Sequence, residues 1–446
     1  MKTKIAINGF GRIGRNAFKI AFERPDLEIV ALNDLTDTKT LAYLLKHDSA
    51  YGEYQHEVSF DEQNIIVDGQ HINVLAEKDP AALPWKDMAV DVVIESTGFF
   101  VDPDKARAHI TAGAKRVIIS APAKGDNADS ADTIVLGVNE DKLKNGTDII
   151  SNASCTTNCI TPVAAVVEHA FGIEKLMMTT IHSYTASQKL QDAPGGKALR
   201  DGRAAAENIV PTTTGASIAA AKAFPALKDV FGGFEVRVPT PVVSLADFAI
   251  VTKRTVTKEE VNEAFKKAAA DPYYQGILAV SEEELVSTDF IGNSHSAIVD
   301  LPLTNVVGGN LLKVVAWYDN EWGYSNRLVE LTADVGKHLG QPDSQTIPED
   351  ASTSIPPSAS LEMSDDKPSE QPKHEAMLEA PKPEDFLPAP HPSVGIEDKE
   401  PHEMSAAHQP VEAGPQLSSG EMADHQPGPP AMFPENHSGP TEEHQF

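Results

Sequence analysis

The sequence predicts an α/β protein with two folded parts, a doubly wound α/β domain followed by an α+β domain with a mixed sheet. Short β-branched runs alternate with helix-like stretches over about the first 150 residues, which is the pattern of parallel βαβ units. Longer strand-like stretches then surround one helix-like segment, as in an α+β domain. Beyond residue 340 prolines and acidic residues are concentrated, so we expect a disordered C-terminal tail.

The doubly wound domain is assigned to residues 1–152. It begins with a buried strand at 4–7, a helix at 13–22 and a second strand at 28–32. The same strand pattern returns three more times, at residues 91–95, 116–120 and 133–137. Because strands and helices alternate, the sequence predicts an open sheet of mainly parallel strands.

The α+β domain is assigned to residues 153–318, and a helix is predicted within it at 258–270. Its strands are predicted at residues 175–180, 234–238, 242–252 and 312–318. Longer strands with fewer intervening helices indicate a mixed sheet rather than a second set of βαβ units.

A final amphipathic helix is assigned to residues 319–340, and we expect it to return to the first domain. Apolar residues recur there at about 3.6-residue spacing, namely Leu328, Leu331, Val335 and Leu339. Gly340 and Pro342 follow, as is typical beyond the end of a helix.

Charge is concentrated in the tail. The 446 residues carry a net charge of −29, with 32 prolines. From Gln341 onward, 19 prolines, 21 acidic residues and 4 lysines give a net charge of −17, which leaves −12 for the first 340 residues. We therefore predict that residues 341–446 are disordered, because they have too little apolar surface and too much like charge to collapse.

The tail could be a solvated appendage or an acidic interaction arm whose partner is unknown. We expect deletion of everything after Gly340 to leave activity and assembly intact. The acidic balance of the chain argues against nucleic acid or an anionic membrane as a partner. No apolar run is long enough for a membrane span or a signal peptide, so we expect a cytoplasmic protein.

A glycine motif lies between the first predicted strand and the first predicted helix. Gly9, Gly11 and Gly14 form G-x-G-x-x-G, and Asp34 follows 20 residues later, after the second strand. In this setting the first glycine makes the turn, the second admits a pyrophosphate and the third allows close packing of helix and strand. Asp34 would accept from the ribose hydroxyls and repel a 2′-phosphate. The motif predicts a Rossmann-type domain that binds NAD.

A candidate nucleophile lies at the start of the second domain. Ser154 is a plausible N-cap, so Cys155 would lie in the first turn of a helix, where the dipole stabilises a thiolate. Cys159, one turn later, is expected to be a buried apolar residue. His182 ends a predicted strand and is the candidate base. The two cysteines suit a reducing compartment better than a disulfide framework, and we expect no metal.

Six motifs together resemble the phosphorylating glyceraldehyde-3-phosphate dehydrogenase family. They are residues 8–15 (NGFGRIGR), 151–161 (SNASCTTNCIT), 182–185 (HSYT), 211–216 (PTTTGA), 234–241 (FEVRVPTP) and 317–325 (WYDNEWGYS). They occur in the family's order and span about residues 1–340. The resemblance implies a two-domain subunit in a homotetramer, with Cys155 as nucleophile and His182 as base.

The resemblance also implies the chemistry. Cys155 would attack the aldehyde of glyceraldehyde 3-phosphate to give a hemithioacetal, and His182 would take the hydroxyl proton as hydride passes to NAD. Inorganic phosphate would then attack the thioester to release 1,3-bisphosphoglycerate. Protonated His182 would lower the pKa of Cys155 further.

The remaining site residues are carried over by position. Those implied for the substrate phosphate are Thr185 and Arg237; for inorganic phosphate, Ser154, Thr156, Thr214 and Gly215, with Arg200 near both; and for the cofactor, Arg12, Ile13, Lys78, Ser120 and Asn320. Taken alone, each serine or threonine would more often be a cap or a turn residue. A lone arginine inside an apolar strand is different, because it needs an anion.

Two alternatives remain. Erythrose-4-phosphate dehydrogenase shares the cysteine and histidine motifs but is expected to release a free acid by hydrolysis. A binding or adhesion protein could also reuse the scaffold without catalysis. The intact cysteine, histidine and arginine set favours the phosphorylating enzyme.

Overall fold

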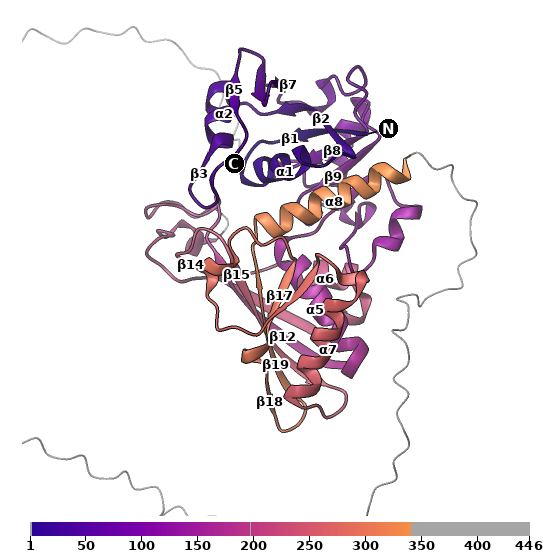
Figure 1. Ribbon diagram of the computed structural model, residues 1–446, viewed down its shortest axis with the longest axis vertical. Helices are drawn as coiled ribbons and strands as arrows, with labels where there is room; N and C mark the ends of the chain where they lie inside the picture. The colour runs from indigo at the N-terminus through magenta and orange to yellow at the C-terminus, as the bar shows by residue number, and fades with distance from the viewer. Residues whose placement is uncertain (1, 197, 340–446) are drawn as a thin grey trace, which may run out of the picture. The chain divides into compact units, whose positions relative to one another are not determined.

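The computed structural model describes residues 2–196 and 198–339. The predicted disordered tail, residues 341–446, lies outside the described residues, as does Gly340. Two large sheets organise the described part of the chain, and Figure 1 shows them one above the other with α8 running between them.

The first sheet has the strand order β10-β11-β9-β8-β1-β2-β7-β6-β5. Its parallel strands are β1 (Thr3–Asn8), β2 (Leu27–Asn33), β7 (Gln70–Leu75), β8 (Val92–Glu95), β9 (Arg116–Ile119), β10 (Asp132–Thr133) and β11 (Ile149–Ser151). The antiparallel strands β5 (Val58–Phe60) and β6 (Asn64–Val67) extend one edge. The predicted doubly wound fold is confirmed. The strand order reverses beside β1, which is where such sheets bind ligands at their carboxyl ends.

The helices and minor strands of this part connect the sheet strands. They are α1 (Arg12–Phe22), α2 (Thr38–Lys46), α3 (Pro103–Ala106) and α4 (Ala108–Thr111), with a small hairpin of β3 (His47–Asp48) and β4 (Gly52–Glu53). The predicted strand at 133–137 is wrong beyond Thr133. Val135 donates its backbone N–H to Asn139 Oδ1 at 2.8 Å, and Gly137 turns the chain with φ +80°. The apolar run is buried, but in a turn rather than in the sheet.

The second sheet is mixed, as predicted, with the order β13-β14-β12-β15-β19-β17-β16 and β18 beside β19. Its strands are β12 (Ile173–Ser183), β13 (Val210–Thr212), β14 (Phe231–Val238), β15 (Ser244–Thr252), β16 (Leu278–Ser281), β17 (Ala297–Asp300), β18 (Asn305–Val307) and β19 (Leu311–Tyr318). The central strand β12 is parallel to β14 and antiparallel to β15.

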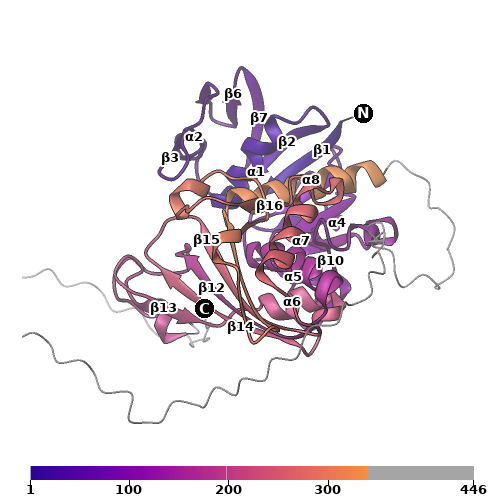
Figure 2. The same ribbon diagram turned by 60° about the horizontal axis from the view of Figure 1, so that its bottom comes forward.

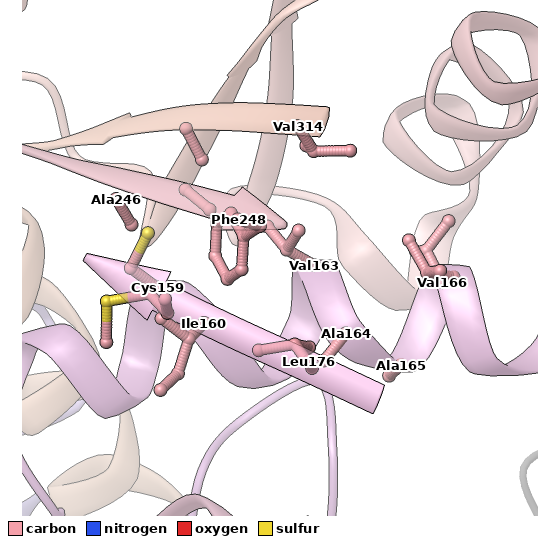
Figure 3. Close-up of a cluster of buried hydrophobic side chains, with 14 of the residues drawn as sticks. Cys159, Ile160, Val163, Ala164, Ala165, Val166, Leu176, Ala246, Phe248 and Val314 are labelled. Atoms are coloured by element: carbon pink, nitrogen blue, oxygen red, sulfur yellow. The ribbon is translucent and has the colours of Figure 1, made fainter. Parts of the chain in front are cut away.

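Three helices gather on one side of this sheet in both views (Figures 1 and 2): α5 (Cys155–Phe171), α6 (Ala216–Ala223) and α7 (Lys258–Ala270). Figure 3 shows the apolar contact, in which Ile160 and Val163 of α5 lie close to Phe248 of β15. The predicted helix at 258–270 is confirmed, and its capping box of Thr257 and Glu260 explains where it begins. The other face of the sheet carries no such helices among the described residues.

The last helix, α8 (Trp322–His338), buries Leu328, Leu331 and Val335 in one cluster with Ile5 of β1 and Phe18 of α1. The apolar stripe read from the sequence therefore faces the first sheet. The domain boundaries at residues 152, 318 and 340 stay a prediction. Among the described residues, no helix combines the length and the apolar character that a membrane crossing requires.

Candidate active site

Cys155 is the first residue of α5, at the amino end of the helix. The predicted N-cap is confirmed, since Ser154 Oγ accepts from the backbone N–H of Thr157 at 3.0 Å. Ala153 precedes the cap with φ +54°, and its carbonyl accepts from Tyr324 OH at 3.1 Å. These hydrogen bonds fix the turn before α5, in which Cys155 is partly exposed, whereas Cys159 is fully buried. Only the first of the two thiols can meet a substrate.

His182, near the end of β12, lies against that thiol. Its Nε2 is 3.4 Å from Cys155 Sγ, and its Nδ1 is 2.7 Å from the carbonyl oxygen of Ser183. Nδ1 also lies 2.9 Å from Arg237 Nη1, but that donor has its own acceptor in the same Ser183 carbonyl oxygen, 3.0 Å away. Because the carbonyl can only accept, we assign the hydrogen to Nδ1, which leaves the Nε2 lone pair facing the thiol. The structure therefore joins the predicted nucleophile and base, which the sequence could not do.

The pKa values of this pair differ from the sequence expectation. Burial raises the pKa of the Cys155 thiol to about 11, and the charge of Glu235 acts in the same direction. Burial, together with the nearby Arg237 cation, lowers the pKa of His182 to about 3. The expected protonated His182 is thus not the resting form, because the site favours a neutral thiol beside a neutral imidazole.

Arg237 lies opposite His182 in the register of β14 and β12. Its Nη1 is 3.0 Å from the carbonyl oxygen of Ser183, and its Nε pairs with Glu235. The arginine therefore has an anion inside the protein, because Glu235, two residues earlier on the same face of the strand, supplies one. No described residue bonds to Nη2 of Arg237, so that donor is available to a ligand.

Sequence reasoning missed Glu235 and Tyr318. The signal for Glu235 was the i, i+2 spacing to Arg237, which places both side chains on one face of a strand. Tyr318 occupies a predicted phosphate contact from inside the protein, because its OH lies 3.0 Å from the hydroxyl of Thr156. Thr156 can therefore offer its backbone N–H at the start of α5, but its hydroxyl is already bonded.

The other predicted phosphate contacts lie at the surface. Thr185 Oγ1 is 3.0 Å from Ser187 Oγ in the loop after β12, and Arg200 is exposed in the short helix Leu199–Gly202. Thr214 Oγ1 accepts from the backbone of Ala216, and Gly215 precedes α6 with open space around its Cα. Within the described residues no hydrogen bond joins these four to Cys155 or His182, so their shared site stays a prediction.

The three glycines of the predicted cofactor loop meet different surroundings. Gly9 has φ +91°, and a Cβ there would lie 2.7 Å from the backbone nitrogen of Thr97. A Cβ on Gly14 would lie 2.0 Å from the carbonyl oxygen of Gly9, whereas Gly11 has nothing within 4 Å. The turn, the close packing and the open approach expected for a pyrophosphate are all present, so these residues fit NAD.

Asp34 and Arg12 both have partners inside the protein. Asp34 accepts from the backbone nitrogens of Phe10 at 2.8 Å and Thr36 at 3.0 Å, so it holds the glycine loop. Arg12 pairs with Asp48 and Glu321 at 2.6 Å and 2.5 Å, and these carboxylates raise its pKa. Its guanidinium therefore connects α1 to the start of α8 and is not free for a phosphate.

The remaining cofactor candidates belong to several different elements. Ile13 is half-buried in α1, Lys78 is exposed beyond β7, and Ser120 follows β9. Asn320 is buried just before α8, where its Oδ1 accepts from Ser183 Oγ at 2.8 Å and Ser244 Oγ at 3.1 Å. Since Oδ1 is occupied, its Nδ2 is the atom left to donate to a ligand.

Comparisons with known proteins agree with this geometry. Residues 3–103 match the family model "Glyceraldehyde 3-phosphate dehydrogenase, NAD binding domain", and residues 154–320 match the model of the C-terminal domain of the same family. Glyceraldehyde-3-phosphate dehydrogenase of Streptomyces coelicolor is 52% identical over 341 residues, covering 76% of this chain and 100% of the relative. The Geobacillus stearothermophilus enzyme of that name is 53% identical over 334 residues, covering 75% and 98%. Such matches leave one conclusion: this chain belongs to the glyceraldehyde-3-phosphate dehydrogenase family.

Proposed function

We propose that this chain oxidises D-glyceraldehyde 3-phosphate with NAD and inorganic phosphate to 1,3-bisphosphoglycerate, with Cys155 as nucleophile and His182 as general base. The observation that carries the proposal is the 3.4 Å contact between Cys155 Sγ and the unprotonated Nε2 of His182. A nucleophile and a base within reach of each other, the base oriented by a third group, are what covalent catalysis requires.

The proton moves through His182 at each step. Nε2 takes the thiol proton as Sγ attacks the aldehyde carbon, and it returns the proton to the new oxygen to complete the hemithioacetal. Nε2 then takes the hydroxyl proton while the carbon is oxidised to a thioester. NAD supplies the hydride acceptor when bound. Phosphate then attacks the thioester carbon and gives up its own proton to water, while protonated Nε2 returns its proton to the departing sulfur, so the site ends as it began.

Two anion sites are part of the proposal. Nη2 of Arg237 has no bond to a described residue and can donate to the substrate phosphate, and we assign Thr185 to the same phosphate. Ser154, Thr156, Thr214 and Gly215 lie at the amino ends of α5 and α6. Helix amino ends present unpaired N–H groups, which suits them to inorganic phosphate. Arg200 is exposed in the short helix Leu199–Gly202, and we assign it a supporting positive charge for both sites.

We also propose that the working unit is a homotetramer in the cytoplasm. Met177 of β12 and Phe234 of β14 are exposed on the face of the second sheet opposite α5. The segment between β12 and β13 adds Leu190, Leu199 and Ile209, which are also exposed. Large apolar side chains left exposed in this number are typical of subunit contacts. The two cysteines are free thiols, as expected in a reducing compartment.

Initial rates of NADH formation, measured with and without inorganic phosphate, test the proposed reaction. We expect rapid turnover of glyceraldehyde 3-phosphate with NAD only when phosphate is present, and none in Cys155→Ser. Undiminished turnover without phosphate would favour hydrolysis of the thioester, as expected of erythrose-4-phosphate dehydrogenase. Absence of turnover in both conditions would favour a non-catalytic role.

A further inference from the structure

The carboxyl ends of four neighbouring strands in the first sheet are joined by one run of buried hydrogen bonds. The strands are β8, β1, β2 and β7, which lie side by side in that order. Glu95 ends β8, Asn8 ends β1 and Asn33 ends β2. Each of these side chains is at least 95% buried, so their polar atoms must find partners inside the protein.

One end of the run is a histidine fixed as a single tautomer. The indole Nε1 of Trp85 can only donate, and it lies 2.9 Å from His109 Nδ1. Nδ1 therefore carries the lone pair and Nε2 carries the hydrogen. Trp85 and His109 are fully buried. His109 thus approaches Glu95, 3.1 Å away, as a donor.

Glu95 accepts hydrogen bonds from four donors. One of its oxygens accepts from the backbone N–H of Thr97 at 2.8 Å and from the Thr97 hydroxyl. The other accepts from Asn8 Nδ2 and from His109 Nε2. Three of the four neighbours are N–H groups, which can only donate, and an ionised carboxylate can accept from all four at once. The set fits an ionised carboxylate.

From Asn8 the run continues across the next two strands. Asn33 Nδ2 donates to Asn8 Oδ1 at 2.6 Å and to the carbonyl oxygen of Glu77 at 2.9 Å. Asn33 Oδ1 accepts from the backbone N–H of Glu77, also at 2.9 Å. The hydrogen bonds therefore reach from Thr97, beyond β8, to the loop beyond β7.

These strand ends are the points from which the proposed cofactor contacts leave the sheet. Gly9 follows Asn8, Asp34 follows Asn33, and Lys78 follows Glu77. Ser96, next to Glu95, donates to the carbonyl oxygen of Gly9 at 2.7 Å. A change at Glu95 would therefore act on several of these loops together.

We propose that Glu95 is a positioning residue for the dinucleotide, which acts through Asn8 and Thr97 and is held in place by His109. The buried carboxylate fixes the spacing of the strand-end loops before the cofactor binds. The loops therefore lose less conformational entropy on binding. Glu95 itself need not touch NAD. The inference rests on the proposed cofactor contacts and adds the group that orients them.

Glu95→Gln tests the proposal, because an amide nitrogen would face at least one of the four donors. We expect the Kd of NAD, measured by calorimetry, to rise at least tenfold. ADP-ribose, which lacks the nicotinamide, should weaken equally, while the KM for glyceraldehyde 3-phosphate at saturating NAD should change less than twofold. A folded Glu95→Gln protein with the wild-type Kd would overturn the proposal.

Asp300→Asn is the matched control. Asp300 is a buried carboxylate in the second sheet that accepts from Trp317 Nε1 at 3.0 Å. We expect both variants to lower the melting temperature, but only Glu95→Gln to weaken NAD binding. Equal weakening by Asp300→Asn would mean that general destabilisation is the cause, which would overturn the positioning role.

Thr97→Val keeps the carboxylate and removes one of its donors, so it tests the same connection if Glu95→Gln fails to fold. We expect a severalfold rise in the Kd of NAD, and an unchanged Kd would overturn the proposal. NAD binding by the wild-type protein separates the proposed cofactor site from the proposed role of Glu95. If the wild-type protein does not bind NAD, the cofactor site itself is wrong, whereas normal binding that neither variant weakens contradicts only the role of Glu95.

Discussion

Cys155 Sγ and His182 Nε2 lie 3.4 Å apart, although 27 residues separate them in the sequence. The contact exists because α5 begins, and β12 ends, at the same edge of the second sheet. Ser183 fixes the imidazole from behind through its carbonyl oxygen. The short path lets one nitrogen serve as acceptor and donor of the same proton in successive steps.

His182→Gln removes that acceptor while nearly keeping the volume of the side chain. We expect kcat to fall by about 10²–10⁴, the usual contribution of general acid–base catalysis, with the Kd of NAD unchanged within twofold. Steady-state rates and calorimetry give both values. His71→Gln, at an exposed histidine far from Cys155 in sequence, is the control and should retain full activity. A His182→Gln enzyme with near-normal kcat would refute the base assignment.

The neutral His182 should make the protein sensitive to acid. Burial and the Arg237 cation lower its pKa from the ordinary 6.5 to about 3 in the folded state. Between these values the unfolded chain binds a proton that the folded chain does not, so stability falls as pH falls below 6.5. At pH 5 this contributes about 2 kcal/mol of destabilisation.

Denaturant unfolding of wild type and His182→Gln at pH 7.5 and pH 5 measures this contribution. We expect the variant to lose about 2 kcal/mol less stability than wild type between the two pH values, because other groups titrate alike in both proteins. If His182 were instead an imidazolium paired with a thiolate, the wild type would lose less stability between pH 7.5 and pH 5 than His182→Gln does. That outcome would contradict the neutral pair.

Glu235→Gln should make Cys155 more reactive. The carboxylate raises the pKa of the thiol, second only to burial, so its removal lowers that pKa and increases the thiolate fraction at pH 8. We expect iodoacetamide to alkylate Cys155 severalfold faster, with Cys159 remaining slow because it is fully buried. Mass spectrometry of the labelled peptides gives both rates. Glu259→Gln, at an exposed site on α7, should leave them unchanged, and an equal or slower rate in Glu235→Gln would contradict the argument.

Short-range sequence patterns predicted much of the fold. Most features that they did not predict depend on contacts between residues far apart in the sequence. The glycine motif, the N-cap Ser154 and the apolar stripe of α8 depend on residues a few positions apart, so the sequence carries them directly. The strand at 133–137 was mispredicted because an apolar run is buried equally well in a turn that Asn139 stabilises. The neutral state of His182 depends on burial and on Arg237 of a different strand, and neither can be seen before the sheet is assembled.

Asp34 offers the last prediction, because it has one role seen in the structure and a second expected from the motif. Its carboxylate holds the backbone of Phe10 in the glycine loop, and its charge disfavours a 2′-phosphate on the ribose. Asp34→Asn keeps a hydrogen-bond acceptor and removes the charge, so we expect kcat/KM with NADP to rise relative to NAD. Asp34→Ala removes both and should lower kcat/KM with either cofactor at least tenfold. Initial rates with the two cofactors distinguish the variants, and a gain of NADP activity in Asp34→Ala equal to that in Asp34→Asn would show that the Phe10 contact is dispensable.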